Sequence, residues 1–153
     1  MAEPRRAAET VPRFEGGRFL IVDARYYDAI GADLLAGATY DLVGVAGALE
    51  IPAGMAIALD GAKAAGRPYD GAVALGCVVR GETFHFEIVA GESARALMDM
   101  SVERRLAIGN GILTTETIAQ AEERADPERG DKGGDAARAA IGLAHLARRL
   151  VNR

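Results

Sequence analysis

The stretch that decides the fold is GAVALGCVVRGETFHFEIVAGESARALMDMSVER, residues 71–104, where a continuous apolar run leads into a long helical pattern. Residues 71–79 contain no charged side chain, which is typical of a strand that is buried on both faces of a parallel sheet. Residues 85–104 are predicted to form a helix, because one broad face carries the apolar residues Ile88, Val89, Ala96, Leu97 and Met100. A buried strand that runs directly into a long helix indicates a parallel crossover.

The same alternation of strand and helix extends on both sides of this stretch. Further strands are predicted at residues 18–23 (RFLIVD), 40–45 (YDLVGV) and 107–113 (AIGNGIL). Helices are predicted at residues 29–38, from Pro52 to before Gly66, after a Thr115 cap with Glu116 in the first turn, and at residues 134–150. This order predicts an α/β fold with a four-stranded parallel sheet flanked by helices.

Length, charge and cysteine content limit the class of protein. The 153 residues suit a single domain, which we place at residues 17–153 after a mobile N-terminal arm at residues 1–16. A net charge of −4 argues against a general nucleic-acid binder. No apolar run is long enough for a membrane span or a signal peptide. Cys77 is the only cysteine, so no internal disulfide is possible, and we expect a cytoplasmic protein.

The last predicted helix carries more apolar side chains than one sheet face needs. Its large apolar residues, which lie around more than one face of the helix, are Ile141, Leu143, Leu146, Leu150 and Val151. One face is expected to cover the sheet and the others to contact a neighbouring subunit, so we expect a homo-oligomer.

The loop after the strand at 71–79 is the most informative place for a ligand. In open parallel sheets, ligands bind beyond the carboxyl ends of the strands. Gly81, Thr83 and His85 lie there, at the start of the long helix, where free N–H groups attract anions. The segment therefore predicts a phosphate site with an acid/base beside it. Taken singly, each residue has a plainer interpretation, since a first-turn histidine is more often a capping or solvated residue and one glycine is a weak signal.

Four motifs in order make the chain resemble the lumazine synthases: GALEIP (47–52), GCVVRGETFHFEIV (76–89), GILTTE (111–116) and ERADPERGDKGGDAA (123–137). The resemblance covers nearly all of residues 19–144. It implies a flavodoxin-like three-layer sandwich, and assembly into pentamers, some of which build decamers or sixty-subunit shells. It also implies active sites between adjacent subunits. The implied reaction joins 5-amino-6-(D-ribitylamino)uracil to 3,4-dihydroxy-2-butanone 4-phosphate, giving the riboflavin precursor 6,7-dimethyl-8-ribityllumazine, with no cofactor and no metal.

The resemblance also assigns the residues that bind the pyrimidine substrate. Tyr26 matches an aromatic residue that stacks on the ring, where Phe or Trp is more usual. Glu50 and Ala48 match residues that meet the ribityl chain, and Leu49 lies between them. A carboxylate suits that task because it accepts hydrogen bonds from hydroxyl groups. The remaining matches are ring-pocket positions: Val78, Val79 and, from the neighbouring subunit, Asn110.

A second group of matched residues surrounds the phosphate and the reacting atoms. Gly81, Glu82 and Thr83 match the phosphate loop, and Arg80 precedes it among the expected substrate-binding residues. Arg124 matches a phosphate-binding arginine supplied by the neighbour. The other two matches are Lys132, with a supporting role, and His85, the acid/base.

The chain departs from the family pattern in its first crossover. Only 16 residues separate Asp23 from Tyr40, where members usually have a longer helix, and Ala46 replaces a common proline. Two other interpretations stay open: a flavodoxin-like module that holds a lumazine or flavin without catalysis, and a structural shell protein with weak activity. The presence of both His85 and Arg124 favours the enzyme over the binding module.

Overall fold

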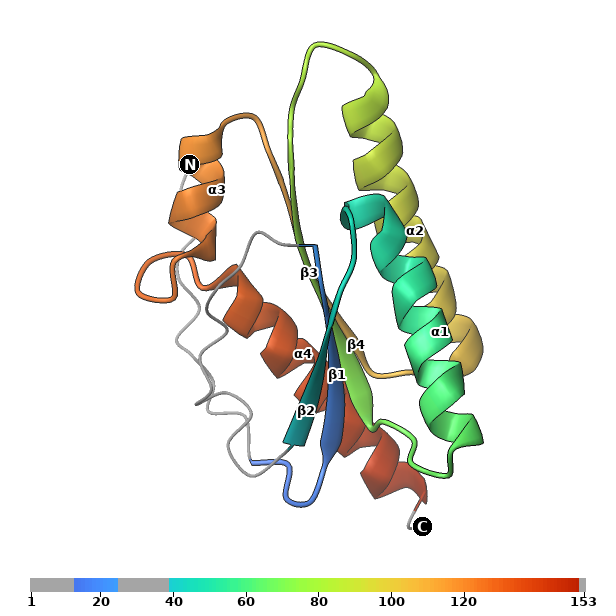
Figure 1. The fold of residues 1–153 in the computed structure, drawn as a ribbon. Coiled ribbons are helices and arrows are strands. Elements are labelled where there is room, and N and C mark those ends of the chain that lie inside the picture. Colours follow the sequence, from blue (N-terminus) through green and yellow to red (C-terminus); the bar gives the residue numbers. More distant parts are fainter. Residues whose placement is uncertain (1–12, 25–38, 152–153) are drawn as a thin grey trace.

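Four parallel strands form one sheet in the order β2-β1-β3-β4, with helices on both faces (Figure 1). The structure is a computed structural model that describes residues 13–24 and 39–151. Its elements are β1 (Arg18–Asp23), β2 (Thr39–Gly44), the short 3₁₀ helix η2 (Ala48–Glu50), α1 (Ile51–Ala64), β3 (Gly71–Val79), α2 (His85–Arg104), β4 (Ile108–Thr115), α3 (Ile118–Ala125) and α4 (Lys132–Val151). The predicted α/β class is confirmed. The helix predicted at residues 29–38 lies outside the described residues.

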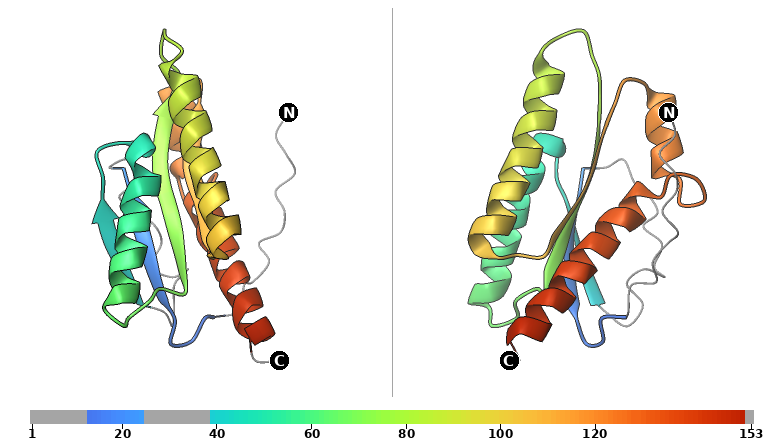
Figure 2. Two further views of the ribbon diagram at one scale, coloured as in Figure 1. Left: turned by 90° about the vertical axis from the view of Figure 1, so that its right-hand side faces the viewer. Right: turned by 180° about the vertical axis from the view of Figure 1, so that it is seen from behind.

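The two inner strands are buried on both faces, as their continuous apolar runs predict. Figure 2 shows α1 and α2 over one face of the sheet and α4 over the other. Toward α4, the strands bury Phe19, Ile21, Val73 and Leu75. Toward α1 and α2, they bury Leu20, Val22, Ala72 and Ala74. Alternate residues of one strand thus belong to two different cores.

Small residues bring α4 very close to the edge strand β4. The buried face of α4 consists largely of alanines, namely Ala136, Ala137, Ala140 and Ala144. A Cβ atom added at Gly109 would lie 1.9 Å from the carbonyl oxygen of Ala136. The backbones of strand and helix therefore pack against each other directly, which only glycine permits at this position.

The β4–α3 junction differs from the sequence-based prediction. Thr115 does not cap α3; it is the last residue of β4, is buried, and pairs with Val79 of β3. The cap is Thr117, whose side chain accepts a hydrogen bond from the N–H of Gln120 at 3.2 Å. Pairing with β3 extends the strand to Thr115, so Glu116 precedes the helix instead of lying in its first turn.

The chain is already packed at Phe14, within the stretch predicted as an arm. The Phe14 ring is 2% exposed and meets Phe19 and His145 edge-on, with centroid distances of 5.4 and 4.9 Å. The guanidinium of Arg148 lies 3.6 Å from the centroid of the same ring. Residues 1–12 lie outside the described residues, and for them the mobile arm stays a prediction.

Several large apolar side chains are exposed on the helices. On α4, Ile141 is buried against the sheet, whereas the other residues named above are exposed: Leu143, Leu146, Leu150 and Val151. On α2, Met98 and Val102 are 64% and 69% exposed. Within the described ranges, no helix has both the length and the apolar character that a membrane span requires.

Candidate active site

The loop at residues 80–84 leaves the carboxyl edge of the sheet at the end of β3 and leads into α2 (Figure 1). His85 is the first residue of α2, and it is exposed to solvent. Phe84 at the N-cap position provides no side-chain hydrogen bond to the helix. The N-cap side chain therefore occupies none of the first N–H groups of α2, the groups for which the position of the loop predicts an anion.

Gly81 lies in open space in this single chain. A Cβ atom added there would meet no heavy atom within 4 Å, and the flanking residues Glu82 and Thr83 are exposed. Packing within the chain thus gives no reason for a glycine at this position. A ligand or another subunit that approaches the backbone closely would give one.

The residues predicted to meet the ribityl chain form η2, which contacts both β3 and α2. Ala48 is buried beneath α2, while Leu49 is 40% exposed and Glu50 is exposed. Glu50 also serves as the N-cap residue of α1, with Pro52 in the first turn of that helix. Glu50 thus lies beyond the carboxyl end of β2, as predicted, and the structure adds that η2 is on the same face of the sheet as α2.

Val78 and Val79 end β3 at the same edge of the sheet. Both are half-buried and pair with Thr114 and Thr115 of β4. The two residues lie between η2 and the loop that leads to His85. Tyr26, predicted to stack on the pyrimidine ring, lies outside the described residues.

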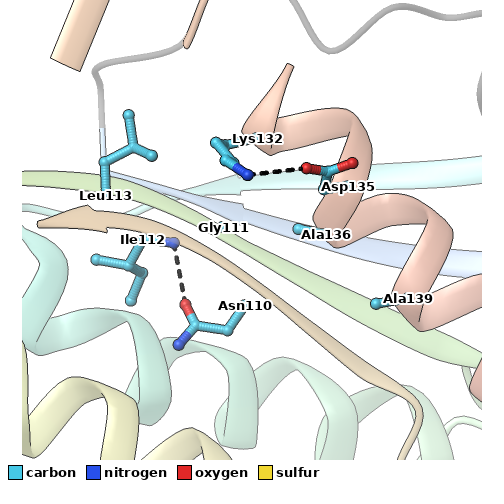
Figure 3. Close-up of a pocket in the computed structure, with 8 residues that line it drawn as sticks. All are labelled: Asn110, Gly111, Ile112, Leu113, Lys132, Asp135, Ala136 and Ala139. Carbon is cyan, nitrogen blue, oxygen red and sulfur yellow. Dashed lines mark hydrogen bonds and ion pairs between the residues drawn. The ribbon is translucent and has the colours of Figure 1, made fainter. Parts of the chain in front are cut away.

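Asn110, predicted to face the ring from the neighbouring subunit, and Lys132, predicted to have a supporting role, both line one cavity at β4 and α4 (Figure 3). The cavity has a volume of about 270 Å³ and is open to solvent at the edge of the sheet. Complete small-molecule sites usually occupy roughly 300–1,000 Å³. The Asn110 side chain accepts a hydrogen bond from the N–H of Ile112 at 3.0 Å, which satisfies a donor of the edge strand.

Lys132 is held beside this cavity by an acidic neighbour. Its ammonium group lies 3.3 Å from Asp135, which in turn pairs with Arg138 at 2.6 Å. Burial raises the pKa of Asp135, but hydrogen bonds from Arg138 and Lys132 outweigh it, so that the net pKa lies below the ordinary value. The i,i+3 spacing of Lys132 and Asp135 was a signal in the sequence that the motif analysis did not use.

Arg124 lies near the end of α3, and its guanidinium donates to the carbonyl oxygen of Gln120 at 3.0 Å. Helices α3 and α4 are packed against each other, on the face of the sheet opposite α1 and α2 (Figure 2). Among the described residues, neither Arg124 nor Lys132 forms a hydrogen bond or ion pair with the segment 81–85. One chain thus presents two separate groups of predicted site residues.

The side chain of Arg80 links the end of β3 to α2 and to the turn between β4 and α3, and sequence reasoning missed these contacts. Its guanidinium forms ion pairs with Glu87 at 2.5 Å and Glu116 at 2.7 Å, and it lies 4.2 Å from the ring centroid of Phe86. Hydrogen bonds to Glu87 and then Glu116 raise the pKa of Arg80, and the Arg80 hydrogen bond lowers the pKa of Glu87. The strand register brings Glu116 to Arg80, and no local spacing reveals it.

One further titratable group, the thiol of Cys77, lies on β3 next to Val78. Burial raises the pKa of the Cys77 thiol, and a hydrogen bond with Thr115 lowers it by less. Within the described part of the chain, no three His, Cys, Asp or Glu side chains are arranged to hold a metal ion.

Comparison with known proteins identifies the family. The family model described as 6,7-dimethyl-8-ribityllumazine synthase matches residues 16–148. A protein of that name from Methylocella silvestris is 64% identical, over 97% of this chain and 97% of its own. A second, from Afipia carboxidovorans, is 56% identical over 99% of both chains. A third, from Rhizobium meliloti and named 6,7-dimethyl-8-ribityllumazine synthase 1, is 59% identical over 86% of this chain and 92% of its own.

The alignments with the first two relatives span 159 and 161 positions, more than the 153 residues of this chain. Those relatives therefore carry residues that this chain lacks. The four-stranded parallel sheet, the order of the motifs and the extent of these matches agree with one another. The chain belongs to the 6,7-dimethyl-8-ribityllumazine synthase family of enzymes.

Proposed function

We propose that this chain condenses 5-amino-6-(D-ribitylamino)uracil with 3,4-dihydroxy-2-butanone 4-phosphate, releasing phosphate, water and 6,7-dimethyl-8-ribityllumazine for riboflavin biosynthesis. The supporting observation is that His85 is exposed in the first turn of α2, where the N-cap residue makes no side-chain hydrogen bond to the helix. The two substrates are inferred from membership in the family. We place the protein in the cytoplasm, where its single cysteine needs no disulfide partner.

The phosphate of the butanone substrate is proposed to lie on the backbone N–H groups of Gly81, Glu82 and Thr83, with the hydroxyl of Thr83 as a further donor. A helix N-terminus stabilises such a group through its dipole and its free donors. Holding the phosphate here places the keto group of the substrate near the imidazole of His85. Much of the acceleration comes from keeping both substrates in one site.

His85 is proposed to move protons in successive steps. The 5-amino group adds to the ketone, and water leaves to give an imine. Elimination of phosphate follows, and the ribityl-bearing nitrogen attacks the resulting carbonyl group, closing the ring with loss of a second water. Each step transfers a proton to or from an oxygen, nitrogen or carbon atom, and one imidazole serves several of them.

The pyrimidine substrate is proposed to lie between η2 and the end of β3. Glu50 accepts hydrogen bonds from ribityl hydroxyls, next to Ala48 and Leu49, while Val78 and Val79 line the ring pocket. Tyr26 is proposed to stack on the ring. No cofactor is expected to take part.

The second group of residues is proposed to act on the site of a neighbouring subunit. Arg124 lies on α3 and Lys132 on α4, whereas His85 and Glu50 lie on the α1–α2 face. Asn110 lies on the edge strand β4, with its side chain on the side of the strand away from Lys132 (Figure 3). The sheet separates the two faces within one chain (Figure 2). A homopentamer, or a multiple of it, brings the guanidinium of one chain to the phosphate loop of the next.

Fluorescence of the lumazine product tests the reaction. We expect product from the purified protein and both substrates, and a turnover roughly 10²-fold lower for His85→Ala, because one proton-transferring group typically contributes 10²–10⁴-fold. Arg149→Ala, which removes an exposed arginine on α4, is the matched control for Arg124→Ala. Product formation no faster than the background reaction would leave the binding-module and structural-shell interpretations.

Mixed assemblies test whether the site is shared. We expect assemblies of Arg124→Ala chains alone, or of His85→Ala chains alone, to have little activity. After they are unfolded together and refolded, about one quarter of the sites in a random cyclic assembly combine an intact His85 with an intact Arg124. Recovery of activity toward one quarter of the wild-type value supports a site shared between subunits. If mixed assemblies of native mass recover no activity, the shared site is contradicted.

A further inference from the structure

Arg80 is fixed at its backbone where β3 ends. Its N–H donates to the carbonyl oxygen of Thr115 at 2.8 Å, which extends the hydrogen bonding between β3 and β4 by one residue. Beyond this point the chain leaves the sheet and forms the loop that leads to α2. Arg80 is therefore the last residue before the proposed phosphate loop that has a fixed backbone partner.

The side chain of Arg80 returns to elements on both sides of that loop. Nη1 lies 2.5 Å from Glu87 Oε1, in the first turn of α2, and the guanidinium stacks on Phe86 of the same turn. Nε lies 2.7 Å from Glu116 Oε2, in the turn between β4 and α3. The guanidinium is planar and donates in fixed directions, so these contacts link the first turn of α2 to the turn between β4 and α3.

The segment between these contacts has few interactions of its own. In the part of the chain that the structure describes, Gly81, Glu82 and Thr83 take part in no side-chain hydrogen bond or ion pair, and all three are exposed. The loop conformation therefore depends on its two ends. The Arg80–Glu87 pair closes the loop by joining the residue before it to the first turn of the helix after it.

We propose that Arg80 is a positioning residue, which holds the 81–84 loop and the first turn of α2 in the geometry that binds the substrate phosphate. This inference rests on the proposed function, since it concerns the same phosphate. It differs from the sequence-based expectation that Arg80 binds substrate directly. Two of the three guanidinium nitrogens of Arg80 already form ion pairs with carboxylates.

Substitution of the partner carboxylate Glu116 distinguishes a positioning role of Arg80 from direct binding of phosphate. If Arg80 positions the loop, Glu116→Gln removes one anchor and weakens phosphate binding. If Arg80 binds phosphate directly, Glu116→Gln frees its guanidinium and removes a nearby negative charge, so phosphate binding becomes tighter. The two roles thus predict changes of opposite sign for the same variant.

The experiment measures inhibition by inorganic phosphate and the KM of the phosphate-bearing substrate, in the assembled protein. For Arg80→Gln we expect the inhibition constant of phosphate and this KM to rise about five-fold, with a smaller change in kcat, since each exposed ion pair contributes up to about five-fold. Glu116→Gln should show a smaller rise in the same direction, and Arg80→Lys should lie between Arg80→Gln and the wild type. Arg104→Gln is the control, because it removes an exposed ion pair between α2 and Asp60 of α1, at the other end of the helix.

Hydrogen exchange at the amides of residues 80 and 88, which donate to the carbonyl oxygens of Thr115 and Phe84 at the two ends of the loop, provides a readout that needs no activity. We expect these amides to exchange faster in Arg80→Gln and Glu116→Gln than in Arg104→Gln, at equal thermal stability and native mass. Equal exchange rates in all three variants, or tighter phosphate inhibition in Glu116→Gln, would overturn the positioning role. If the wild type forms no lumazine, the proposed function fails, while the exchange rates still decide whether Arg80 anchors the loop.

Discussion

The substitution Gly109→Ala tests how closely the edge strand β4 and helix α4 are packed. The added methyl group would lie 1.9 Å from the oxygen and 2.7 Å from the carbon of the Ala136 carbonyl group. Both are backbone atoms, which cannot rotate away as the end of a side chain does. The helix must therefore move away from the strand.

That movement opens the core beneath α4, where Ala137 and Ala140 are fully buried. Overpacking a well-packed core costs roughly 1–3 kcal/mol, and a clash with backbone belongs at the upper end of that range. We therefore expect Gly109→Ala to lower the free energy of unfolding by about 3 kcal/mol. The same movement would widen the cavity that Asn110 and Lys132 line.

Urea unfolding followed by far-ultraviolet circular dichroism measures this effect, since the chain has no tryptophan. Gly142→Ala is the matched control, because it lies on the exposed side of α4, where an added Cβ would meet no atom within 4 Å. The control should stabilise the protein by up to about 1 kcal/mol through helix propensity. The packing argument is wrong if Gly109→Ala differs from the wild type by less than about 0.5 kcal/mol, or if the control destabilises equally.

Three other properties follow from contacts of the described residues. Phe14→Ala should lower the free energy of unfolding by about 3 kcal/mol, because Phe-to-Ala changes in cores cost 3–5 kcal/mol, and a change below about 1 kcal/mol would show that the N-terminal packing contributes little. Hydrogen bonds from Tyr69 and then Arg18 hold the pKa of Asp41 below its usual value, so its stabilising effect is present above about pH 3.9 and is lost as the pH falls toward the folded-state pKa. Urea unfolding of Asp41→Asn between pH 3 and pH 6 should accordingly differ from the wild type most at the upper end, and a constant difference across this range would contradict the assignment. Because burial raises the pKa of the Cys77 thiol, iodoacetamide should modify it more slowly at pH 8 in the native protein than in urea, and equal rates would refute its protection.

Local patterns predicted the elements around the site well. The strand at residues 71–79 and the helix at residues 85–104 have the predicted bounds, because an uninterrupted apolar run and a long helical pattern are both properties of neighbouring residues. The prediction failed at Thr115, where two threonines in a row suited either a strand end or a cap. Thr115 belongs to the strand because it pairs with Val79, a residue far from it in the chain.

The sequence by itself determined the α/β class, the order of the motifs and the types of residue available for chemistry, since each is encoded in spacing along the chain. Only the tertiary structure decided which of these residues meet. In the structure, Asn110 and Lys132 line the same cavity, and Glu116 forms an ion pair with Arg80. Arg124 lies on the face of the sheet opposite His85 (Figure 2). The physical reason is that register in a parallel sheet and the side on which a helix crosses are set by packing of the whole core, which joins residues that no local period relates.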